Sequence, residues 1–268
     1  MYGGKIVFSG EYTPQLLAAV RDFVEYYPDE KAAIILTADV TLATALNIWV
    51  MFIYYKGPTP PNGTFDNFTG IPSILNTCGT TTYYDLLSSN NEIVLHGFIY
   101  RIFTESMSLP SSSDGAEVMG TIYNYWYNVS STISDVDCLI ASLAFQPMPR
   151  IIAQKALDNG GDVIDLDTSI DRIVMEMDFS YCFNSDNGRV DSTIQTLYTG
   201  MKNHIATFQQ QGKLPEGYLP LFMNDAYWKQ DYVGRLRPET QQLLEATQRA
   251  YDPTKFWETQ THGWSIPS

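Results

Sequence analysis

Two strand-like stretches that follow each other closely set the strongest limit on the fold. Residues 32–40 (AAIILTADV) and 45–57 (ALNIWVMFIYYKG) are rich in β-branched and aromatic residues, and only residues 41–44 separate them. A parallel crossover needs a dozen or more residues, so these two strands are predicted to run antiparallel. Both stretches are apolar on both faces over much of their length, which predicts that both faces of the sheet are covered.

Further elements follow the same mixed pattern along the chain. Helices and strands alternate, but several strands again lie too close together for parallel crossovers. The sequence therefore predicts an α+β fold, with a large, mostly antiparallel sheet and helices packed on one face, in a single domain over 1–268 with a C-terminal tail over 218–268. The predicted strands lie at 91–106, 138–147 and 172–183, and the predicted helices at 13–27, 80–89, 114–133, 149–159, 188–211 and 238–250.

The charge and the apolar segments limit the partners. The 30 acidic residues against 16 basic ones give a formal net charge of −14, which repels phosphate backbones and anionic lipid. We therefore expect no nucleic acid and no membrane as partners. The sequence shows no signal peptide and no apolar run of about 18 residues, which predicts a cytoplasmic protein, or a secreted one if the natural N-terminus lies further upstream.

Cysteine and histidine spacing predicts neither disulfides nor a metal site. Cys78, Cys138 and Cys182 are widely separated and form no CxxC pair, so we expect buried free thiols. No two histidines have the spacing of metal ligands, and no metal is expected.

The stretch RIVMEMDFSYCF over 172–183 carries the best candidates for acid–base chemistry. Two-residue alternation places Glu176 and Asp178 on one face of this strand and its Met and Phe side chains on the other. If the apolar face packs on helices, burial of the carboxylates raises their pKa into a range suited to proton transfer. The alternative is that both carboxylates face water.

A histidine and two aromatic residues share one face of the strand predicted at 91–106. These are His96, Phe98 and Tyr100. His96 is a third candidate for the catalytic base, and the two aromatic side chains are candidates for substrate binding; a structural role for the histidine is the alternative.

Five segments, in order along the chain, resemble one protein family. They are YGGKIVF, FDNFTGIPSILNTCGTTTYYDLL, LAFQPMPRIIAQKALDNGG, FMNDAYWKQDYVGRL and YDPTKFW. Together they resemble the substrate-side half of fungal berberine-bridge-enzyme-like FAD-linked oxidases, in the vanillyl-alcohol-oxidase superfamily.

The resemblance implies further residues of a substrate pocket. Gln146 ends a strand that borders the pocket, where its amide would orient a carbonyl or make an end-of-strand hydrogen bond. Asn224 matches an asparagine near the flavin, or it caps a helical turn. Tyr227 and Trp228 line the same cavity or fill the core.

The flavin-binding features of such oxidases are not recognisable in this sequence. We find no G-x-G-x-x-G and no Arg-x-Gly-Gly-His attachment sequence, so no cofactor is expected. A sheet face that would otherwise look toward the flavin would be a broad apolar surface. We expect a homodimer, a partner chain or rearranged helices to cover it.

Without a hydride acceptor, the remaining chemistry is acid–base and conformational catalysis. The leading hypothesis is a flavin-free enzyme of fungal specialised metabolism that cyclises, isomerises or dehydrates a small apolar or polycyclic substrate, or guides a pericyclic step. The first alternative is a subunit or fragment of an FAD-dependent oxidoreductase. The second is a non-catalytic protein that binds a small molecule.

Overall fold

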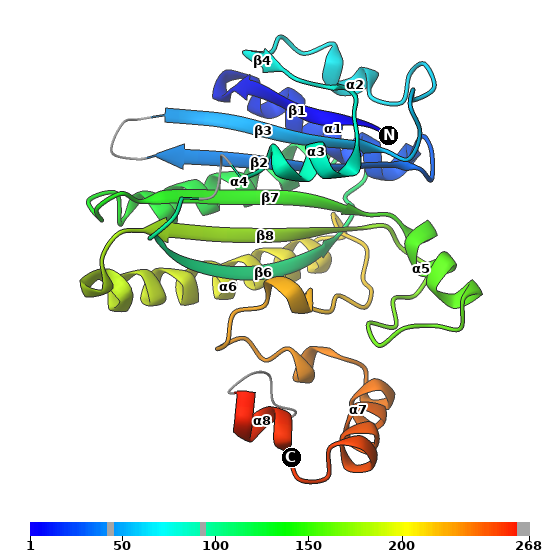
Figure 1. The fold of residues 1–268 in the computed structure, drawn as a ribbon, viewed down its shortest axis with the longest axis vertical. Coiled ribbons are helices and arrows are strands. Elements are labelled where there is room, and N and C mark those ends of the chain that lie inside the picture. The colour runs from blue at the N-terminus through cyan, green and yellow to red at the C-terminus, as the bar shows by residue number, and fades with distance from the viewer. Residues whose placement is uncertain (42–45, 92–94, 262–268) are drawn as a thin grey trace.

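One antiparallel sheet organises the chain (Figure 1). In this computed structural model, residues 1–41, 46–91 and 95–261 are described. The 8-stranded sheet has the order β4-β1-β3-β2-β7-β8-β6, with β5 also pairing with β1, and every pairing is antiparallel. The predicted α+β class is therefore confirmed. The strands are β1 (Tyr2–Ser9), β2 (Ala32–Thr41), β3 (Leu46–Tyr55), β4 (Leu75–Asn76), β5 (Gly79–Thr80), β6 (Ile99–Ser108), β7 (Ile140–Met148) and β8 (Arg172–Tyr181).

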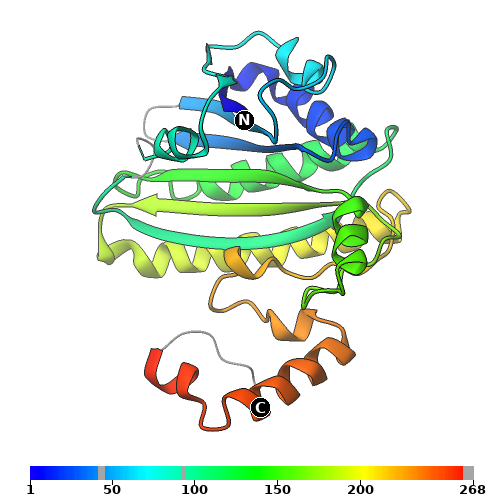
Figure 2. The ribbon, with the colours of Figure 1, turned by 45° about the vertical axis from the view of Figure 1, so that its right-hand side comes forward.

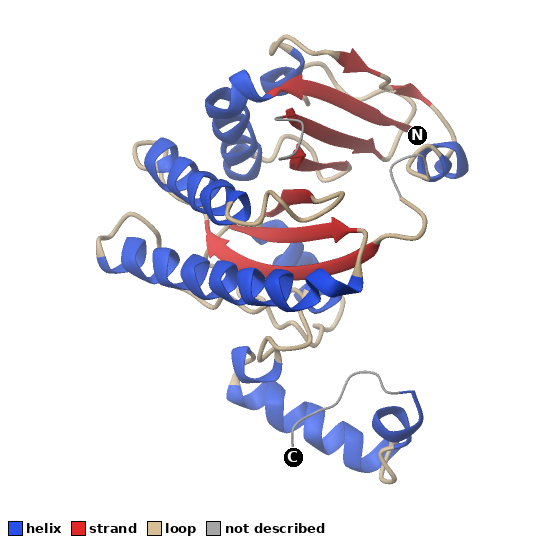
Figure 3. Cartoon of the chain, turned by 90° about the vertical axis from the view of Figure 1, so that its left-hand side faces the viewer, coloured by secondary structure: helices blue, strands red, loops and turns tan. Residues whose placement is uncertain are grey.

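Three long helices cover one face of this sheet (Figure 3). They are α1 (Thr13–Tyr26), α4 (Gly115–Ser131) and α6 (Asn187–Gln210). In α6 the apolar positions recur at helical spacing from Val190 to Phe208, and all six are buried against the sheet side. The shorter helices are α2 (Asp66–Thr69), α3 (Tyr83–Ser88), α5 (Arg150–Asp158), α7 (Pro238–Tyr251) and α8 (Phe256–Thr261).

The main core lies between the sheet and the three long helices. Trp49 of β3 and Trp126 of α4 are fully buried there, and Tyr123 stacks 5.4 Å from the Trp49 ring. The Trp49 indole Nε1 donates to Thr13 Oγ1 at 2.8 Å, which satisfies its one polar group. This contact ties the start of α1 to the centre of the sheet.

The opposite face of the sheet is only partly covered. In β2 the residues Ala32, Ile34 and Leu36 are buried, whereas Ile35, which points the other way, is 38% exposed. The prediction of full cover on both faces is therefore wrong for the described residues. Among the described residues, α3, α5 with the loop after it, and the chain after α6 lie on this side (Figure 1). We call this side of the sheet the open face; its positions include Ile35, Thr37, Asp39, Phe52, Tyr54, Thr104, Ser142, Gln146, Val174, Glu176 and Asp178.

The C-terminal helices lie away from the sheet (Figure 2). Helices α7 and α8 follow a small apolar cluster of their own, formed by Leu221, Tyr232 and Leu236. None of the helices in the described part of the chain is both long and apolar enough for a membrane span.

Two expectations about local structure are corrected. The strand predicted at 91–106 begins at Ile99, because Gly97 takes a φ of +86° and forms a turn with His96; residues 92–94 lie outside the described residues. The expectation of free thiols is wrong for two cysteines, since Cys138 and Cys182 form a disulfide and Cys78 alone is free. Ile140 of β7 pairs with Ser180 of β8. Cys138 lies two residues before Ile140 and Cys182 two residues after Ser180, so the antiparallel register places the two cysteines opposite each other.

Candidate functional site

A row of polar residues crosses three neighbouring strands of the open face. The strand register places Asp39 of β2, Ser142 of β7 and Asp178 of β8 opposite one another. The Ser142 hydroxyl donates to Asp39 Oδ1 at 2.6 Å. Neither Asp39 nor Ser142 is among the site residues predicted from the sequence, although a single carboxylate inside the apolar stretch AAIILTADV indicates a polar position on a buried strand.

Glu176 lies next to this row and shares the face of Asp178, as strand alternation predicts. It stands opposite Ala144 of β7 and Thr104 of β6. Burial raises the pKa of Glu176 to about 8, and the negative charges of the neighbouring carboxylates add to this shift. Burial, with the nearby charge of Asp39, raises the pKa of Asp178 to about 7. These groups therefore exchange protons near neutral pH.

The hydrogen bonds of the row leave one oxygen without a partner. Among the described residues, no donor reaches Asp178 Oδ1, although the atom is buried. Gln146, proposed from the sequence as a pocket amide, donates from Nε2 to Asp225 Oδ2 at 3.2 Å. Burial also raises the pKa of Asp225, and the Gln146 bond opposes that rise. A fourth carboxylate thus joins the site from the C-terminal tail.

An apolar groove leads to Glu176. It has a volume of about 410 Å³ and lies between the open face and α3. The sheet side is formed by Ile35, Phe52 and Tyr54, and the helix side by Tyr83, Leu86 and Leu87. The first turn of α3 is stabilised by its N-cap Thr82, whose hydroxyl accepts the Asp85 N–H at 3.1 Å. The groove therefore combines aromatic walls with one carboxyl of raised pKa, a combination typical of small-molecule sites.

The three candidates from the 91–106 region lie apart from this groove. His96 is exposed in a turn rather than in a strand, and no hydrogen bond or ion pair between described residues links it to Glu176 or Asp178. Phe98 directly precedes β6. Tyr100, 38% exposed, uses its hydroxyl to accept from the Leu95 N–H at 2.8 Å.

The three candidates from the tail also take different positions. Asn224 is exposed in a single 3-10 turn over Met223–Asp225, whose N-cap is Phe222, so the predicted capping role of Asn224 is wrong. Tyr227 is buried in the main core, where its hydroxyl donates to Asp191 Oδ1 at 2.6 Å. Trp228 is 76% exposed.

Comparisons with known proteins identify relatives in sequence and in fold. No family model matches the sequence. An uncharacterized FAD-linked oxidoreductase of Arthroderma benhamiae is 36% identical over 98% of this chain, which spans 52% of that relative's length. The fold matches 6-hydroxy-D-nicotine oxidase from Arthrobacter nicotinovorans with a TM-score of 0.63 at 13% identity, over 95% of this chain and 52% of that one. It matches a variant of berberine bridge enzyme with a TM-score of 0.56 at 9% identity, over 94% and 53%.

The chain is similar to the substrate-domain half of berberine-bridge-like FAD-linked oxidases. The resemblance inferred from the five sequence segments is therefore confirmed, and so is the substrate-domain fold. In this substrate-domain half, the open face and its carboxylates lie on the side opposite the long helices.

The open face fits the ring system of FAD better than its pyrophosphate. Phe52, Tyr54 and Ile35 present an apolar surface on which a planar ring system can lie. The carboxylates of the same face repel a pyrophosphate, whose charge needs backbone N–H groups or basic residues. The described open face therefore suits the ring end of FAD or an aromatic substrate and does not suit the phosphates.

Proposed function

We propose that this chain forms the substrate-binding wall of an FAD-linked oxidoreductase and supplies its proton acceptor. The observation that carries the proposal is the position of Glu176, a partly buried carboxyl, at the wall of an aromatic groove on the open face. The relationship to an FAD-linked oxidoreductase over nearly the whole chain supports the redox part of the proposal. A bound flavin would supply the two-electron acceptor that protein side chains lack.

The groove is the part of the site that binds and orients the substrate. Its volume of about 410 Å³ is in the range of small-molecule pockets. The rings of Phe52, Tyr54 and Tyr83 favour an apolar or polycyclic organic molecule, because flat aromatic surfaces stack on one another. The substrate would lie between α3 and the sheet, with its polar group toward Glu176.

The carboxylates would move the proton. Oxidation of an alcohol or amine requires that the O–H or N–H group lose its proton, and a base within reach of that group contributes typically 10²–10⁴-fold to the rate. With a pKa of about 8, Glu176 is present in both protonation states near neutral pH. It can therefore accept a proton from the substrate and release it to water after each turnover. Asp178 and Asp39 act on Glu176 through their charge.

The remaining parts of a complete oxidase are also proposals. The relatives extend beyond the matched region by about half their length. We propose that a segment or partner chain equivalent to that half holds the FAD phosphates and covers the open face. A homodimer, expected from the sequence, stays a prediction.

A second candidate function uses the same carboxylates without a redox step. Cyclisation, isomerisation or dehydration also needs a shaped apolar pocket and a proton donor or acceptor. The pKa of Asp178, raised by burial to about 7, favours such chemistry as much as it favours oxidation. The two functions differ in whether flavin is needed for turnover.

The location of the protein is open to a related proposal. The sequence predicts a cytoplasmic protein, with secretion as the alternative. The Cys138–Cys182 disulfide supports the secreted alternative, because disulfides persist mainly in oxidising compartments.

The decisive experiment uses the natural gene product. The protein would be purified, its bound flavin quantified by visible absorbance, and the bleaching of that absorbance followed under anaerobic conditions with a panel of aromatic alcohols and amines. We expect Glu176→Gln to slow bleaching by about 10²-fold or more, while Glu216→Gln, a change at an exposed carboxylate, leaves the rate unchanged. A natural protein that holds no flavin and binds none on addition would refute the oxidoreductase and favour the cofactor-free reaction.

A further inference from the structure

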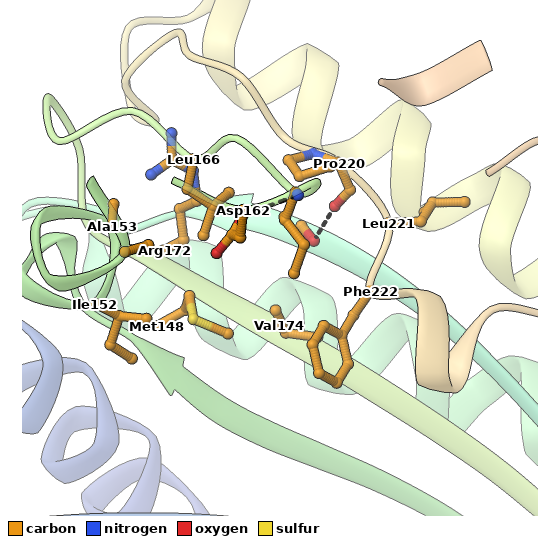
Figure 4. Close-up of a pocket in the computed structure, with 13 residues that line it drawn as sticks. Met148, Ile152, Ala153, Asp162, Leu166, Arg172, Val174, Pro220, Leu221 and Phe222 are labelled. Atoms are coloured by element: carbon orange, nitrogen blue, oxygen red, sulfur yellow. Dashed lines mark hydrogen bonds between the residues drawn. The ribbon is translucent and has the colours of Figure 1, made fainter. Parts of the chain in front are cut away.

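A second cavity lies at the other end of the open face. It has a volume of about 190 Å³ and shares no lining residue with the groove at Glu176. Its floor is the sheet, through Met148 of β7 and Val174 of β8. Its roof is formed by α5, the loop after it and the chain near Pro220. Figure 4 shows the side chains of Met148, Ile152, Val174 and Phe222 around this space.

The polar groups in the wall of this cavity are already engaged. The Ser106 hydroxyl donates to Pro220 O at 2.6 Å. Arg172, which is 2% exposed, donates from Nε to Tyr218 O at 2.8 Å and from Nη2 to Asp167 Oδ2 at 2.6 Å. Asp162 Oδ1 accepts from the Ile164 N–H at 2.9 Å and from the Asp165 N–H at 3.0 Å, so this carboxylate is engaged as well. A guest inside the cavity would therefore meet mainly methyl, methylene, thioether and ring carbon atoms.

The roof of the cavity is fixed by several contacts from the tail. Arg237 pairs with Asp165 at 2.9 Å, and the Tyr218 hydroxyl donates to Ile164 O at 3.0 Å. Arg237 also lies 4.5 Å from the centre of the Tyr218 ring. Because these bonds hold the loop over 159–171 onto the chain near Tyr218, the cavity is preformed and does not depend on a ligand for its shape.

We propose that this cavity is a binding site for a compact apolar group, either one aromatic ring or a short branched alkyl chain. An enclosed apolar cavity of about 150 Å³ is large enough for benzene, and the cavity beside α5, with about 190 Å³, exceeds that volume. The volume of the cavity and the lack of free polar groups among the described residues of its wall both favour a compact apolar ligand. The proposal does not rest on the redox function, since the cavity and the groove have separate walls.

The first test is direct binding of benzene to the full chain. A titration followed by the side-chain methyl NMR signals should show saturable shifts at Met148 and Ile152. Pyrene, whose four fused rings make it much larger than benzene, should not saturate these shifts. Absence of saturable benzene binding to the wild-type chain would overturn the proposal.

Variants of the wall locate the binding. Ala156→Phe fills the space from a partly exposed helical position, so folding should tolerate it, and benzene binding should weaken at least about tenfold. Phe222→Ala enlarges the cavity and should improve the binding of naphthalene relative to that of benzene. Leu87→Ala, in the separate groove, is the matched control and should leave benzene binding unchanged. Benzene binding that survives Ala156→Phe and is lost in Leu87→Ala would place the guest in the groove and refute the site.

Discussion

Ser142 and Asp178 face each other on β7 and β8, yet the Ser142 hydroxyl donates to Asp39 Oδ1 at 2.6 Å and leaves Asp178 Oδ1 with no donor among the described residues. Burial disfavours the charged form of a carboxyl, and an oxygen without a donor gains nothing that offsets this cost. Burial, and after it the nearby charge of Asp39, raises the pKa of Asp178 to about 7. The same row of carboxylates raises the pKa of its neighbour Glu176 further.

The first prediction concerns the pH dependence of stability. The folded chain binds protons at Glu176 and Asp178 more tightly than the unfolded chain, whose carboxyls keep ordinary pKa values near about 4. The stabilising contribution of these protons is therefore complete below about pH 4 and is lost as the pH rises to about 8, by up to about 1.4 kcal/mol per pH unit for each group. Urea unfolding across this range should show the decline.

Neutral variants test the origin of that decline. Glu176→Gln and Asp178→Asn remove the titrating groups, so each should make the fall of the unfolding free energy with pH less steep. Part of the fall with pH should remain in these variants, because burial also raises the pKa values of Asp39 and Asp225. Glu216→Gln should reproduce the wild-type slope. An unchanged slope in the Glu176 and Asp178 variants would contradict this account of the site.

The second prediction concerns Ser142. Its hydroxyl donates to Asp39 and lowers the pKa of that carboxyl against the larger effect of burial. Ser142→Ala should therefore raise the pKa of Asp39, which carboxyl-carbon NMR titration can measure directly. Ser142→Thr keeps the hydroxyl and fits a strand, so its Asp39 should titrate as in the wild type. Equal Asp39 pKa values in the Ala and Thr variants would show that the bond has no such role.

Local periodicity predicts the elements well, and long-range pairing determines the site. The spacing of apolar residues correctly places α6, and two-residue alternation correctly puts Glu176 and Asp178 on one face of β8. Asp39 and Asp225 were missed because they join the site from β2 and from the tail. Only the strand register and the course of the tail bring them there. The Cys138–Cys182 bond was missed for the same reason.

The third prediction concerns the attachment of the tail to the sheet. Glu105 of β6 is 2% exposed, and Arg235 binds both of its oxygens, with Nη2 to Oε1 at 2.7 Å and Nη1 to Oε2 at 3.1 Å. Arg235→Leu would leave a buried carboxylate without its partner. We expect this variant to lose about 3 kcal/mol of unfolding free energy, at the lower end of such losses because Arg235 is partly exposed.

A double variant separates the pair from general damage. Adding Glu105→Leu to Arg235→Leu removes the unpaired charge, so the double variant should be more stable than Arg235→Leu alone. Urea unfolding at neutral pH measures both. If the loss of unfolding free energy in the double variant equals the sum of the losses in the two single variants, the ion pair itself contributes nothing.

The last prediction concerns the disulfide. Cys138 and Cys182 are separated by 44 positions and join the chain before β7 to the end of β8, the two strands that carry Ser142, Glu176 and Asp178. The bond restricts the unfolded chain, so the Cys138→Ser, Cys182→Ser double variant should lose about 3–4 kcal/mol of unfolding free energy, and a reducing agent should do the same to the wild type. Cys78→Ser removes the free thiol and should change the stability little.

Because hydrogen bonds still pair β7 with β8 over their whole length, the folded double variant should keep the raised pKa of Asp178. A return of that pKa to the ordinary range of an exposed carboxyl would mean that the disulfide, and not the sheet, holds the carboxylate row in place.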